Sequence, residues 1–182
     1  IIVGVNLRKP QKSDSILGKH NIDFRSKEML KGNFTLKEEY KFKENPYFNK
    51  IIHNRHERFM KYIAYEVIPF IKSNYKLENN SEKWTIGGFS NGGAFVYSFA
   101  CSYPGLFGNS IVMSPAGYND YDILKSKCKY FICVGKYEHY SFMDNSLEYL
   151  TLMEENQIDY IHKTYDASHD WEMWLGFYIE SI

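Results

Sequence analysis

The sequence lacks the features that would direct a protein into a membrane, onto a nucleic acid or into a disulfide-bonded framework. No apolar run approaches the roughly 18 residues that a membrane-spanning helix needs. The 22 basic and 22 acidic side chains cancel, which argues against a nucleic-acid or anionic-membrane partner, because such partners require a basic excess. Only three cysteines occur, Cys101, Cys128 and Cys133, and none forms a Cys-x-x-Cys pair. This number and spacing exclude a disulfide framework and a zinc ribbon.

The residues that are present give an ordinary globular composition with a large aromatic share. Of the 182 residues, 44% are hydrophobic and 24% are charged, as in typical soluble domains. A chain of this length usually forms one domain and buries roughly 70% of its unfolded surface. We therefore predict a single domain over residues 1–182. The 18% of aromatic residues supply material for its core and for an aromatic-lined cleft.

The N-terminal third of the chain shows two features. The β-branched run at residues 1–5 predicts a buried strand that begins at the first residue. A signal peptide would show a basic segment and then a longer apolar stretch, and neither is present, so the sequence indicates no compartment. Residues 6–54 are polar and rich in lysine, and we predict a long excursion with few regular elements, which in compact domains is usually functional.

Beyond residue 55, helical and strand patterns alternate. Apolar residues at spacings of three and four predict a helix over residues 56–75, disturbed at Pro69. Short apolar runs predict strands at 84–89, 110–114, 130–134 and 160–165. Helical spacing predicts helices at 91–103, 142–155 and 171–182. This alternation predicts an α/β fold with a mostly parallel sheet flanked by helices.

One motif in this region carries chemistry. Residues 88–92, Gly-Phe-Ser-Asn-Gly, match the G-x-S-x-G pattern and lie where a predicted strand ends and a helix begins. This context is typical of a nucleophile elbow, a tight turn that raises a serine hydroxyl above the strand ends. Ser90 is then the candidate nucleophile, and the Asn91 N–H, at the helix N-terminus, is the candidate donor to an oxyanion. The alternative is a glycine-rich turn that merely packs tightly.

A serine nucleophile needs a histidine base, and three histidines follow Ser90. His169 lies just after the predicted strand at 160–165, in a turn-rich stretch where a catalytic loop is expected. His162 lies inside that strand, and His139 lies on the loop expected to supply the acid. We therefore favour His169 over the other two.

The base in turn needs a carboxylate to orient it, and three candidates lie near the ends of predicted strands. Glu138 lies on the loop after the strand at 130–134, where the acid of such a fold is expected. Asp144 lies near the start of the next helix, where capping is its ordinary role. Asp166 is close to His169 in sequence, which does not show that the two pair. Glu138 is the favoured candidate, and an ordinary surface carboxylate is its alternative.

At these residues the chain resembles the putative-esterase branch of the α/β-hydrolases. That group contains feruloyl and acetylxylan esterases, enterochelin-type siderophore esterases and S-formylglutathione hydrolase. The matching segments are IIVGV at 1–5, RSKE at 25–28, EVIPFI at 66–71, GFSNGG at 88–93, YPGLFG at 103–108, SP at 114–115, GKYE at 135–138 and HDW at 169–171. The resemblance implies an α/β-hydrolase fold with Ser90 as nucleophile, His169 as base and Glu138 as acid.

The chain departs from the family pattern in two ways. Glutamate stands at position 138, where many members carry aspartate, and either carboxylate can orient an imidazole. Members of the family also carry further strands before the one that resembles residues 1–5, and a loop there supplies a second oxyanion donor. We therefore expect the N-terminal part of the domain to be incomplete in this sequence.

These features predict a serine carboxylic-ester hydrolase that needs no metal or organic cofactor. The predicted substrate is a small-molecule or carbohydrate-linked ester, and the sequence does not indicate the oligomeric state. Tyr137 and Trp171 lie beside the predicted acid and histidine loops and are candidates for substrate binding, with ordinary packing as the alternative. Two other functions remain open at this point: an acyltransferase that uses the same three residues, and a catalytically silent hydrolase fold that serves as a binding module.

Overall fold

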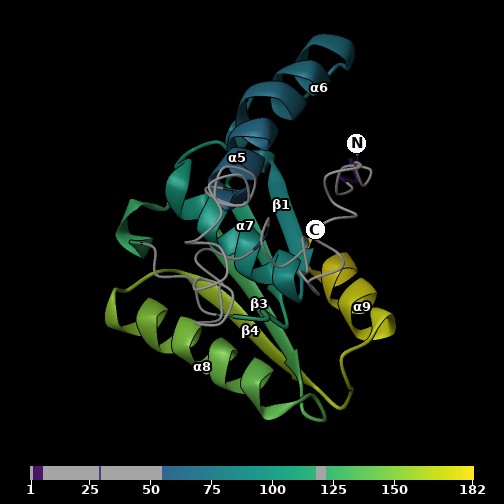
Figure 1. Cartoon of the computed structure of the whole chain (residues 1–182), viewed down its shortest axis with the longest axis vertical. Helices are drawn as coiled ribbons and strands as arrows, with labels where there is room; N and C mark the ends of the chain where they lie inside the picture. Colours follow the sequence, from purple (N-terminus) through teal and green to yellow (C-terminus); the bar gives the residue numbers. More distant parts are fainter. Residues whose placement is uncertain (1, 6–28, 30–54, 118–121) are drawn as a thin grey trace, which may run out of the picture. The chain divides into compact units, whose positions relative to one another are not determined.

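The computed structural model describes residues 2–5, 29, 55–117 and 122–182, and the chain divides into two compact units, Ile1–Leu77 and Glu78–Ile182 (Figure 1). The predicted excursion over residues 6–54 lies almost wholly outside the described residues, as does the RSKE segment at 25–28. That residues 1–182 form one domain stays a prediction.

The strand predicted at residues 1–5 does not form at the four positions that the structure describes. Residues 2–5 have no regular secondary structure, and Ile2 is 81% exposed. β-Branched side chains favour extended backbone, but a strand exists only where its N–H and C=O groups find partners in a ladder. In the described part of the chain these residues have no strand partner, so the expectation of a buried strand was wrong there.

The helical segment of the first unit contains the irregularity that Pro69 predicts. Helix α5 (Arg55–Tyr62) leads into a π-helical turn, η1 (Ile63–Val67), and then into α6 (Ile68–Asn74). The Ile68 N–H donates to the Ile63 carbonyl, five residues back, instead of the usual four. Proline has no N–H and its ring crowds the preceding turn, so a wider turn directly before it relieves the helix.

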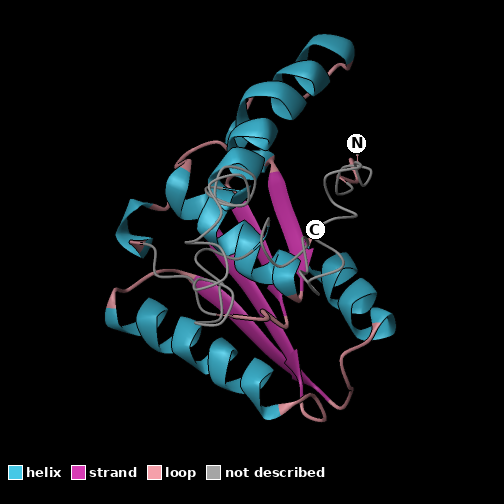
Figure 2. Cartoon of the chain, viewed as in Figure 1, coloured by secondary structure: helices cyan, strands magenta, loops and turns pink. Residues whose placement is uncertain are grey.

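The second unit is a parallel sheet whose strands are connected along the chain by helices (Figure 2). Its strands are β1 (Thr85–Phe89), β2 (Asn109–Met113), β3 (Lys129–Gly135) and β4 (Tyr160–Tyr165), adjacent in the order β1-β2-β3-β4. Its helices are α7 (Asn91–Ser102), α8 (Tyr140–Glu155) and α9 (Trp171–Ser181), with short 3₁₀ turns η2 (Ser81–Lys83) and η3 (Ile123–Lys125). Every strand and helix predicted after residue 80 is present within two residues of its predicted ends, which confirms the α/β fold.

Alternation along the strands assigns the helices to opposite faces of the sheet. On one face, Ile111, Met113 and Cys133 pack against α9 through Met173, Trp174 and Phe177. On the other face, the Tyr130 ring of β3 lies 6.1 Å from Tyr97 of α7, which in turn lies 4.4 Å from Tyr149 of α8. The unit therefore has three layers, with α7 and α8 on one side of the sheet and α9 on the other. Within the described ranges, no helix has both the length and the hydropathy needed to cross a bilayer.

Candidate active site

Because all four strands are parallel, their carboxyl ends meet at one edge, and the loops that follow them lie side by side. One polar side chain of interest follows each strand: Ser90 after β1, Ser114 after β2, Glu138 after β3 and His169 after β4. The loops are joined by hydrogen bonds that extend the ladder beyond the strands. The Lys136 N–H, for example, donates to the Tyr165 carbonyl at 2.9 Å. Residues far apart in sequence thus share one edge of the sheet.

Ser90 occupies a strained turn between β1 and α7. Its φ of 56° and ψ of −125° are uncommon for a residue with a side chain and cost of order 1–3 kcal/mol. Two backbone hydrogen bonds hold the turn to the end of β2 and the loop after it: the Ser90 N–H donates to the Met113 carbonyl at 2.9 Å, and the Ser90 carbonyl accepts from the Ala116 N–H at 3.1 Å. The Ser90 hydroxyl makes no capping bond to α7.

The glycines around Ser90 are required by close backbone approaches. A Cβ at Gly88 would collide with the backbone carbonyl of Gly92, and one at Gly93 would lie 2.8 Å from the Met113 carbonyl oxygen. Real Cβ atoms do not approach backbone atoms this closely, so only glycine fits at both positions. The strand–turn–helix geometry therefore explains the first glycine of the motif, Gly88, and the glycine directly after the motif, Gly93.

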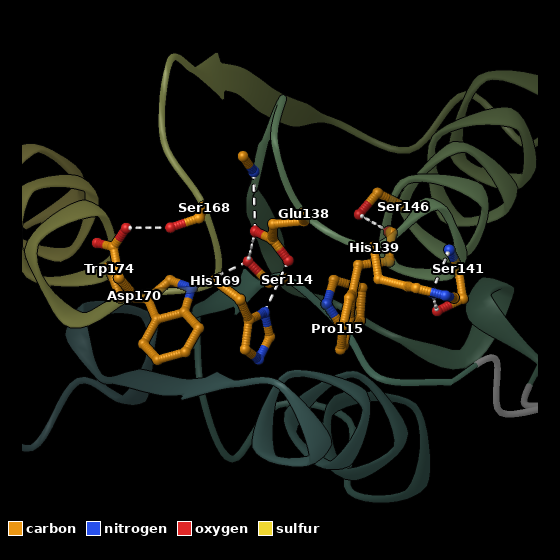
Figure 3. Close-up of polar contacts among 12 residues, drawn as sticks. Ser114, Pro115, Glu138, His139, Ser141, Ser146, Ser168, His169, Asp170 and Trp174 are labelled. Carbon is orange, nitrogen blue, oxygen red and sulfur yellow. Dashed lines mark hydrogen bonds and ion pairs between the residues drawn. The ribbon is translucent and has the colours of Figure 1, made fainter.

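Glu138 and His169 form a hydrogen-bonded pair at the same edge of the sheet (Figure 3). His169 Nδ1 lies 2.7 Å from Glu138 Oε2, the Glu138 side chain is 0% exposed and the His169 side chain is 29% exposed. Because Nδ1 faces a carboxylate, this nitrogen carries the hydrogen and Nε2 is left as the basic atom of the neutral ring. Among the described residues, no hydrogen bond joins the Ser90 hydroxyl to His169; such contacts often form only when substrate is bound.

The second oxygen of the Glu138 carboxylate is held from two sides. Glu138 Oε1 accepts from Ser114 Oγ at 2.5 Å and from the Gly135 N–H at 2.9 Å. Ser114 Oγ accepts in turn from Trp174 Nε1 at 2.9 Å. With three donors in total, the buried carboxylate has the partners that a group withdrawn from water needs.

Two aromatic rings contact the imidazole of His169. The Phe142 ring is stacked on it, with centroids 4.2 Å apart and planes 27° apart. The Trp174 ring meets it edge to face, at 4.6 Å and 88°. Together with the bond from Nδ1 to Glu138, these contacts fix both the position and the plane of the ring.

The other two histidines have different partners. His139 is the N-cap of α8, where its Nδ1 accepts from the Ser141 N–H at 3.3 Å. His162 lies within β4, its ring Nε2 lies 3.5 Å from the Thr164 hydroxyl, and burial lowers its pKa. Among the described residues, neither imidazole ring hydrogen-bonds to the Glu138 carboxylate.

The alternative acids are also engaged elsewhere or exposed. Asp166 forms an exposed ion pair with Lys136 at 2.8 Å. Asp144 lies exposed in α8, beyond the first turn, and His139 holds the capping position that the sequence suggested for it. Of the three carboxylates considered, only Glu138 contacts a histidine base candidate.

The remaining candidates from the sequence lie at the same edge. Asn91 is the first residue of α7, directly after Ser90, so its N–H belongs to the positive end of the helix dipole. Tyr137 and Trp171 are 71% and 66% exposed. The Trp171 ring packs edge-on against Phe89 at 4.5 Å, whereas Tyr137 is tied down through its backbone N–H to the Ala167 carbonyl.

Sequence reasoning missed the contacts that Ser114, Phe142 and Trp174 make with the pair. Ser114 entered only as part of a family motif, and Phe142 and Trp174 were not among the candidate site residues. A signal was available for Ser114, because it is a polar residue directly after a buried parallel strand, the position at which open α/β sheets place functional side chains. No sequence signal distinguishes Trp174, whose indole reaches Ser114 across 60 residues of chain. Within the described ranges, no group of three or more potential metal ligands is arranged around a common point.

A strand, a tight serine turn and a helix, followed along the sheet by a carboxylate and a histidine, are typical of the α/β-hydrolase fold. The model of the putative esterase family matches residues 31–121, half of the chain. The chain therefore belongs to the putative esterase family. Part of the matched range, 31–54 and 118–121, lies outside the described residues.

Solved structures of esterases share this fold. The structure of a ferulic acid esterase from Anaeromyces mucronatus, determined with ferulic acid, matches 75% of this chain and 56% of its own length, with a TM-score of 0.60 and 17% identity. The enterobactin esterase of Shigella flexneri matches 68% of this chain and 36% of its own, with a TM-score of 0.59 and 16% identity. The S-formylglutathione hydrolase of Staphylococcus aureus matches 71% of this chain and 63% of its own, with a TM-score of 0.56 and 16% identity. At such identities the likeness shows the fold alone.

A curated relative is the uncharacterized protein YjcH of Bacillus subtilis strain 168. It is 26% identical over 133 residues, which cover 64% of this chain and 55% of YjcH. The chain thus spans about half the length of this relative, and between 36% and 63% of the three structures described above.

Proposed function

We propose that this protein is a serine carboxylic-ester hydrolase that works through an acyl-enzyme intermediate. One observation carries the proposal: the His169 imidazole is hydrogen-bonded at 2.7 Å to a fully buried carboxylate, at the edge of the sheet that also carries the Ser90 turn. Membership of the putative esterase family supports the same reaction class. In this proposal Ser90 is the nucleophile, His169 the general base and Glu138 the orienting acid.

In the acylation step, the Ser90 hydroxyl gives its proton to His169 Nε2 while its oxygen bonds to the ester carbonyl carbon. The carbonyl π electrons move to the carbonyl oxygen, which becomes an oxyanion. The Asn91 N–H donates to that oxyanion from the first turn of α7, where the helix dipole also favours negative charge. Glu138 stabilises the imidazolium that forms.

The tetrahedral intermediate then collapses, the bond to the alcohol oxygen breaks, and His169 returns its proton to the leaving alcohol. Water attacks the acyl group on Ser90 by the same route, with His169 as base, and releases the acid. The sequence of steps uses side chains, one backbone N–H and water.

The proposed substrate is a small-molecule or carbohydrate-linked ester. Tyr137 and Trp171 support this choice, because both expose large aromatic surfaces at the carboxyl edge of the sheet, one beside Glu138 and the other two residues after His169. Aromatic rings pack well against flat acyl groups and against sugar faces. We propose that these two residues contact the substrate on either side of the ester.

The test is covalent labelling with a fluorophosphonate, followed by intact-mass measurement. We expect one adduct on the wild-type protein, none on Ser90→Ala, and labelling slowed by a factor of about 10³ or more in His169→Ala, because the unassisted hydroxyl is a poor nucleophile. The matched control is His139→Asn, which replaces a histidine 30 residues away and keeps a side chain suited to the N-cap of α8.

The control variant should label at the wild-type rate. A folded wild-type protein that takes no adduct, or an adduct that survives in Ser90→Ala, would contradict the proposal. If labelling behaves as expected, adding a second alcohol during turnover of p-nitrophenyl acetate distinguishes the acyltransferase alternative: a hydrolase gives acetate, and a transferase gives the new ester.

A further inference from the structure

The contacts of Glu138 reach two residues to which the mechanism above assigns no step, Ser114 and Trp174. Three links connect them: Trp174 Nε1 donates to Ser114 Oγ at 2.9 Å, Ser114 Oγ donates to Glu138 Oε1 at 2.5 Å, and His169 Nδ1 donates to Glu138 Oε2 at 2.7 Å. All three are drawn in Figure 3. The Trp174 ring also meets the His169 ring at 4.6 Å, so the links form a closed circuit.

The direction of each link is fixed by chemistry. The indole nitrogen can only donate, and an ionised carboxylate can only accept. A serine hydroxyl usually rotates to suit its surroundings. Here its lone pair faces the Trp174 N–H, so its hydrogen is directed to Glu138. The chain therefore runs one way, from Trp174 through Ser114 to the carboxylate.

A glutamate carboxylate needs hydrogen-bond donors of this kind to fix the orientation of its plane. The terminal torsion of glutamate has a broad energy profile, so the plane of its carboxylate is poorly defined by the side chain alone. Ser114 and the Gly135 N–H both hold Oε1, which turns Oε2 toward His169 Nδ1. Without the Ser114 donor, one of these two restraints is lost.

The backbone at Ser114 supports a specific role. Its φ is 44°, a conformation that residues with side chains rarely adopt, and its N–H donates to the Cys133 carbonyl at 2.8 Å. Glycine would adopt this conformation without cost. A serine here is explained by what its hydroxyl contacts, since it is fully buried and bonded to both Glu138 and Trp174.

We infer that Ser114 and Trp174 are positioning residues that orient the Glu138 carboxylate, and through it the His169 imidazole, for proton transfer. The inference rests on the proposed function. It differs from a packing role in what it predicts: loss of either hydrogen bond should change the His169–Glu138 hydrogen bond and turnover, in addition to any loss of stability.

The experiment compares Ser114→Ala, Trp174→Phe and the double variant by two measurements. The first is proton NMR of the His169 Nδ1–H, whose strong bond to a carboxylate places it far downfield, identified by its absence in His169→Ala. This measurement needs no turnover, so it decides the inference even if the protein proves not to be an esterase. The second is hydrolysis of p-nitrophenyl acetate.

We expect the downfield signal to shift or broaden in both single variants. For Ser114→Ala, kcat should fall about 10- to 100-fold, because a hydrogen bond to a charged group is lost, while KM changes little. Trp174→Phe keeps an aromatic ring against His169 and should lower kcat about 3- to 10-fold. Since both residues act through the same contact, the double variant should be about as active as Ser114→Ala alone.

Two matched controls separate positioning from packing. Ser110→Ala removes a second fully buried serine hydroxyl, which lies within β2 and has no hydrogen-bond partner among the described residues. Trp84→Phe removes another indole N–H, which donates to the Glu78 carbonyl at 2.8 Å near the opposite end of β1. Neither control should move the signal or kcat. The inference is overturned if the signal and kcat stay unchanged in Ser114→Ala and Trp174→Phe, or if the two effects simply add.

Discussion

The two ends of the parallel sheet are built from the same strands but differ in the burial and the hydrogen-bond partners of their polar groups. At the carboxyl end, the buried Glu138 carboxylate accepts from the Ser114 hydroxyl and the Gly135 N–H and is joined to a partly exposed histidine, His169. At the amino end, charged side chains form solvent-exposed ion pairs such as Lys129–Asp159. Neutral groups there bond to nearby backbone or side chains, as when Trp84 Nε1 donates to the Glu78 carbonyl and the Tyr130 hydroxyl donates to Ser126. Among the described residues, the fully buried carboxylate and its histidine partner, which join the loops after β3 and β4, lie at the carboxyl end.

Tight packing alone does not separate the two ends. A Cβ at Gly135, at the carboxyl end, would collide with the Ala167 backbone, and one at Gly108, at the amino end, would collide with the Glu82 backbone. Positive φ also occurs at both ends, at Ser114 and at Gln157. Close approach and strain are therefore general features of this sheet, and what marks the candidate site is the set of side chains that the strained backbone directs at one another.

The largest expected effect is at the carboxyl end, in Glu138→Gln. An amide cannot accept from both Ser114 and His169 as the carboxylate does, and its NH₂ group favours the wrong tautomer of the imidazole. We expect kcat for p-nitrophenyl acetate to fall about 10⁴-fold with little change in KM.

Asp166→Asn is the control for this variant, because Asp166 is exposed and pairs with Lys136. It should change kcat less than about twofold, as expected for an exposed ion pair. If Glu138→Gln keeps more than a tenth of the wild-type activity, Glu138 is not the orienting acid, and the contrast between the two ends of the sheet is contradicted.

The sequence was sufficient for the elements but not for the contacts between their loops. The strands at 84–89 and 160–165 were predictable because short apolar runs end in turn residues, and the mostly parallel sheet was predictable from the alternation of strands with helices. The order of the strands was not predicted. The tight turn at Ser90 was predictable from two glycines at fixed spacing, and its role as nucleophile stays a proposal. The stacking of Phe142 on His169 was not, because it depends on how α8 leaves β3, which no local pattern encodes.

The strand predicted at residues 1–5 shows that a strand prediction from sequence can also fail. Its β-branched pattern is as clear as that of β2, but a strand also needs a neighbour, and sequence pattern cannot supply one.

The preference for Glu138 over Asp144 and Asp166 rested on its place after β3, and the structure brings Glu138 next to His169 for the same reason: parallel strands end at a common edge.

At the amino end, the largest expected effect is on stability, in Gly108→Ala. The added methyl group would collide with the Glu82 backbone, which forms part of η2 and has no flexible side-chain end to move aside. We expect the free energy of unfolding to fall by about 1–3 kcal/mol, as for other overpacked sites. Activity per folded molecule should stay unchanged.

Gly176→Ala is the matched control, because a Cβ there meets nothing within 4 Å and the residue lies inside α9. It should raise the free energy of unfolding by about 0.5–1 kcal/mol through helix propensity. Urea unfolding and p-nitrophenyl acetate turnover measure the two quantities. A Gly108→Ala variant that unfolds normally but loses activity would place function at the amino end as well.

A smaller effect at the amino end depends on pH. Burial raises the pKa of Tyr130, whereas in the unfolded chain a tyrosine ionises near pH 10. The folded state therefore holds a proton that the unfolded state loses above pH 10. Tyr130 contributes its full stabilisation below that pH and lowers the free energy of unfolding by up to about 1.4 kcal/mol per pH unit above it.

Urea unfolding of Tyr130→Phe at pH 9, 10 and 11 tests this sign. The variant should lose stability less steeply than the wild type between pH 10 and 11. Tyr140→Phe, at an exposed tyrosine, should follow the wild-type slope. Equal slopes for all three proteins would contradict the assignment of a neutral, buried hydroxyl to Tyr130.

The smallest expected effect compares positive φ at the two ends directly. Gln157, with φ 55°, follows the C-cap of α8. The N–H groups of Gln157 and Ile158 donate back to the Glu154 and Met153 carbonyls at 3.2 and 2.9 Å. This is a Schellman arrangement, in which glycine is preferred at the position of Gln157. Gln157→Gly should therefore raise the free energy of unfolding by about 0.5–1 kcal/mol, because relief of the strained φ exceeds the added chain entropy.

Ser114→Gly relieves the same kind of strain at the carboxyl end, where φ is 44°, but it also removes the hydroxyl that holds Glu138. It should lower kcat about 10- to 100-fold, as Ser114→Ala does, while Gln157→Gly leaves kcat unchanged. Thermal unfolding and p-nitrophenyl acetate turnover of the two glycine variants decide between strain that only ends a helix and strain that orients a carboxylate. If Ser114→Gly is more stable and fully active, the two positive-φ positions are equivalent, and the Ser114 hydroxyl does not orient the Glu138 carboxylate.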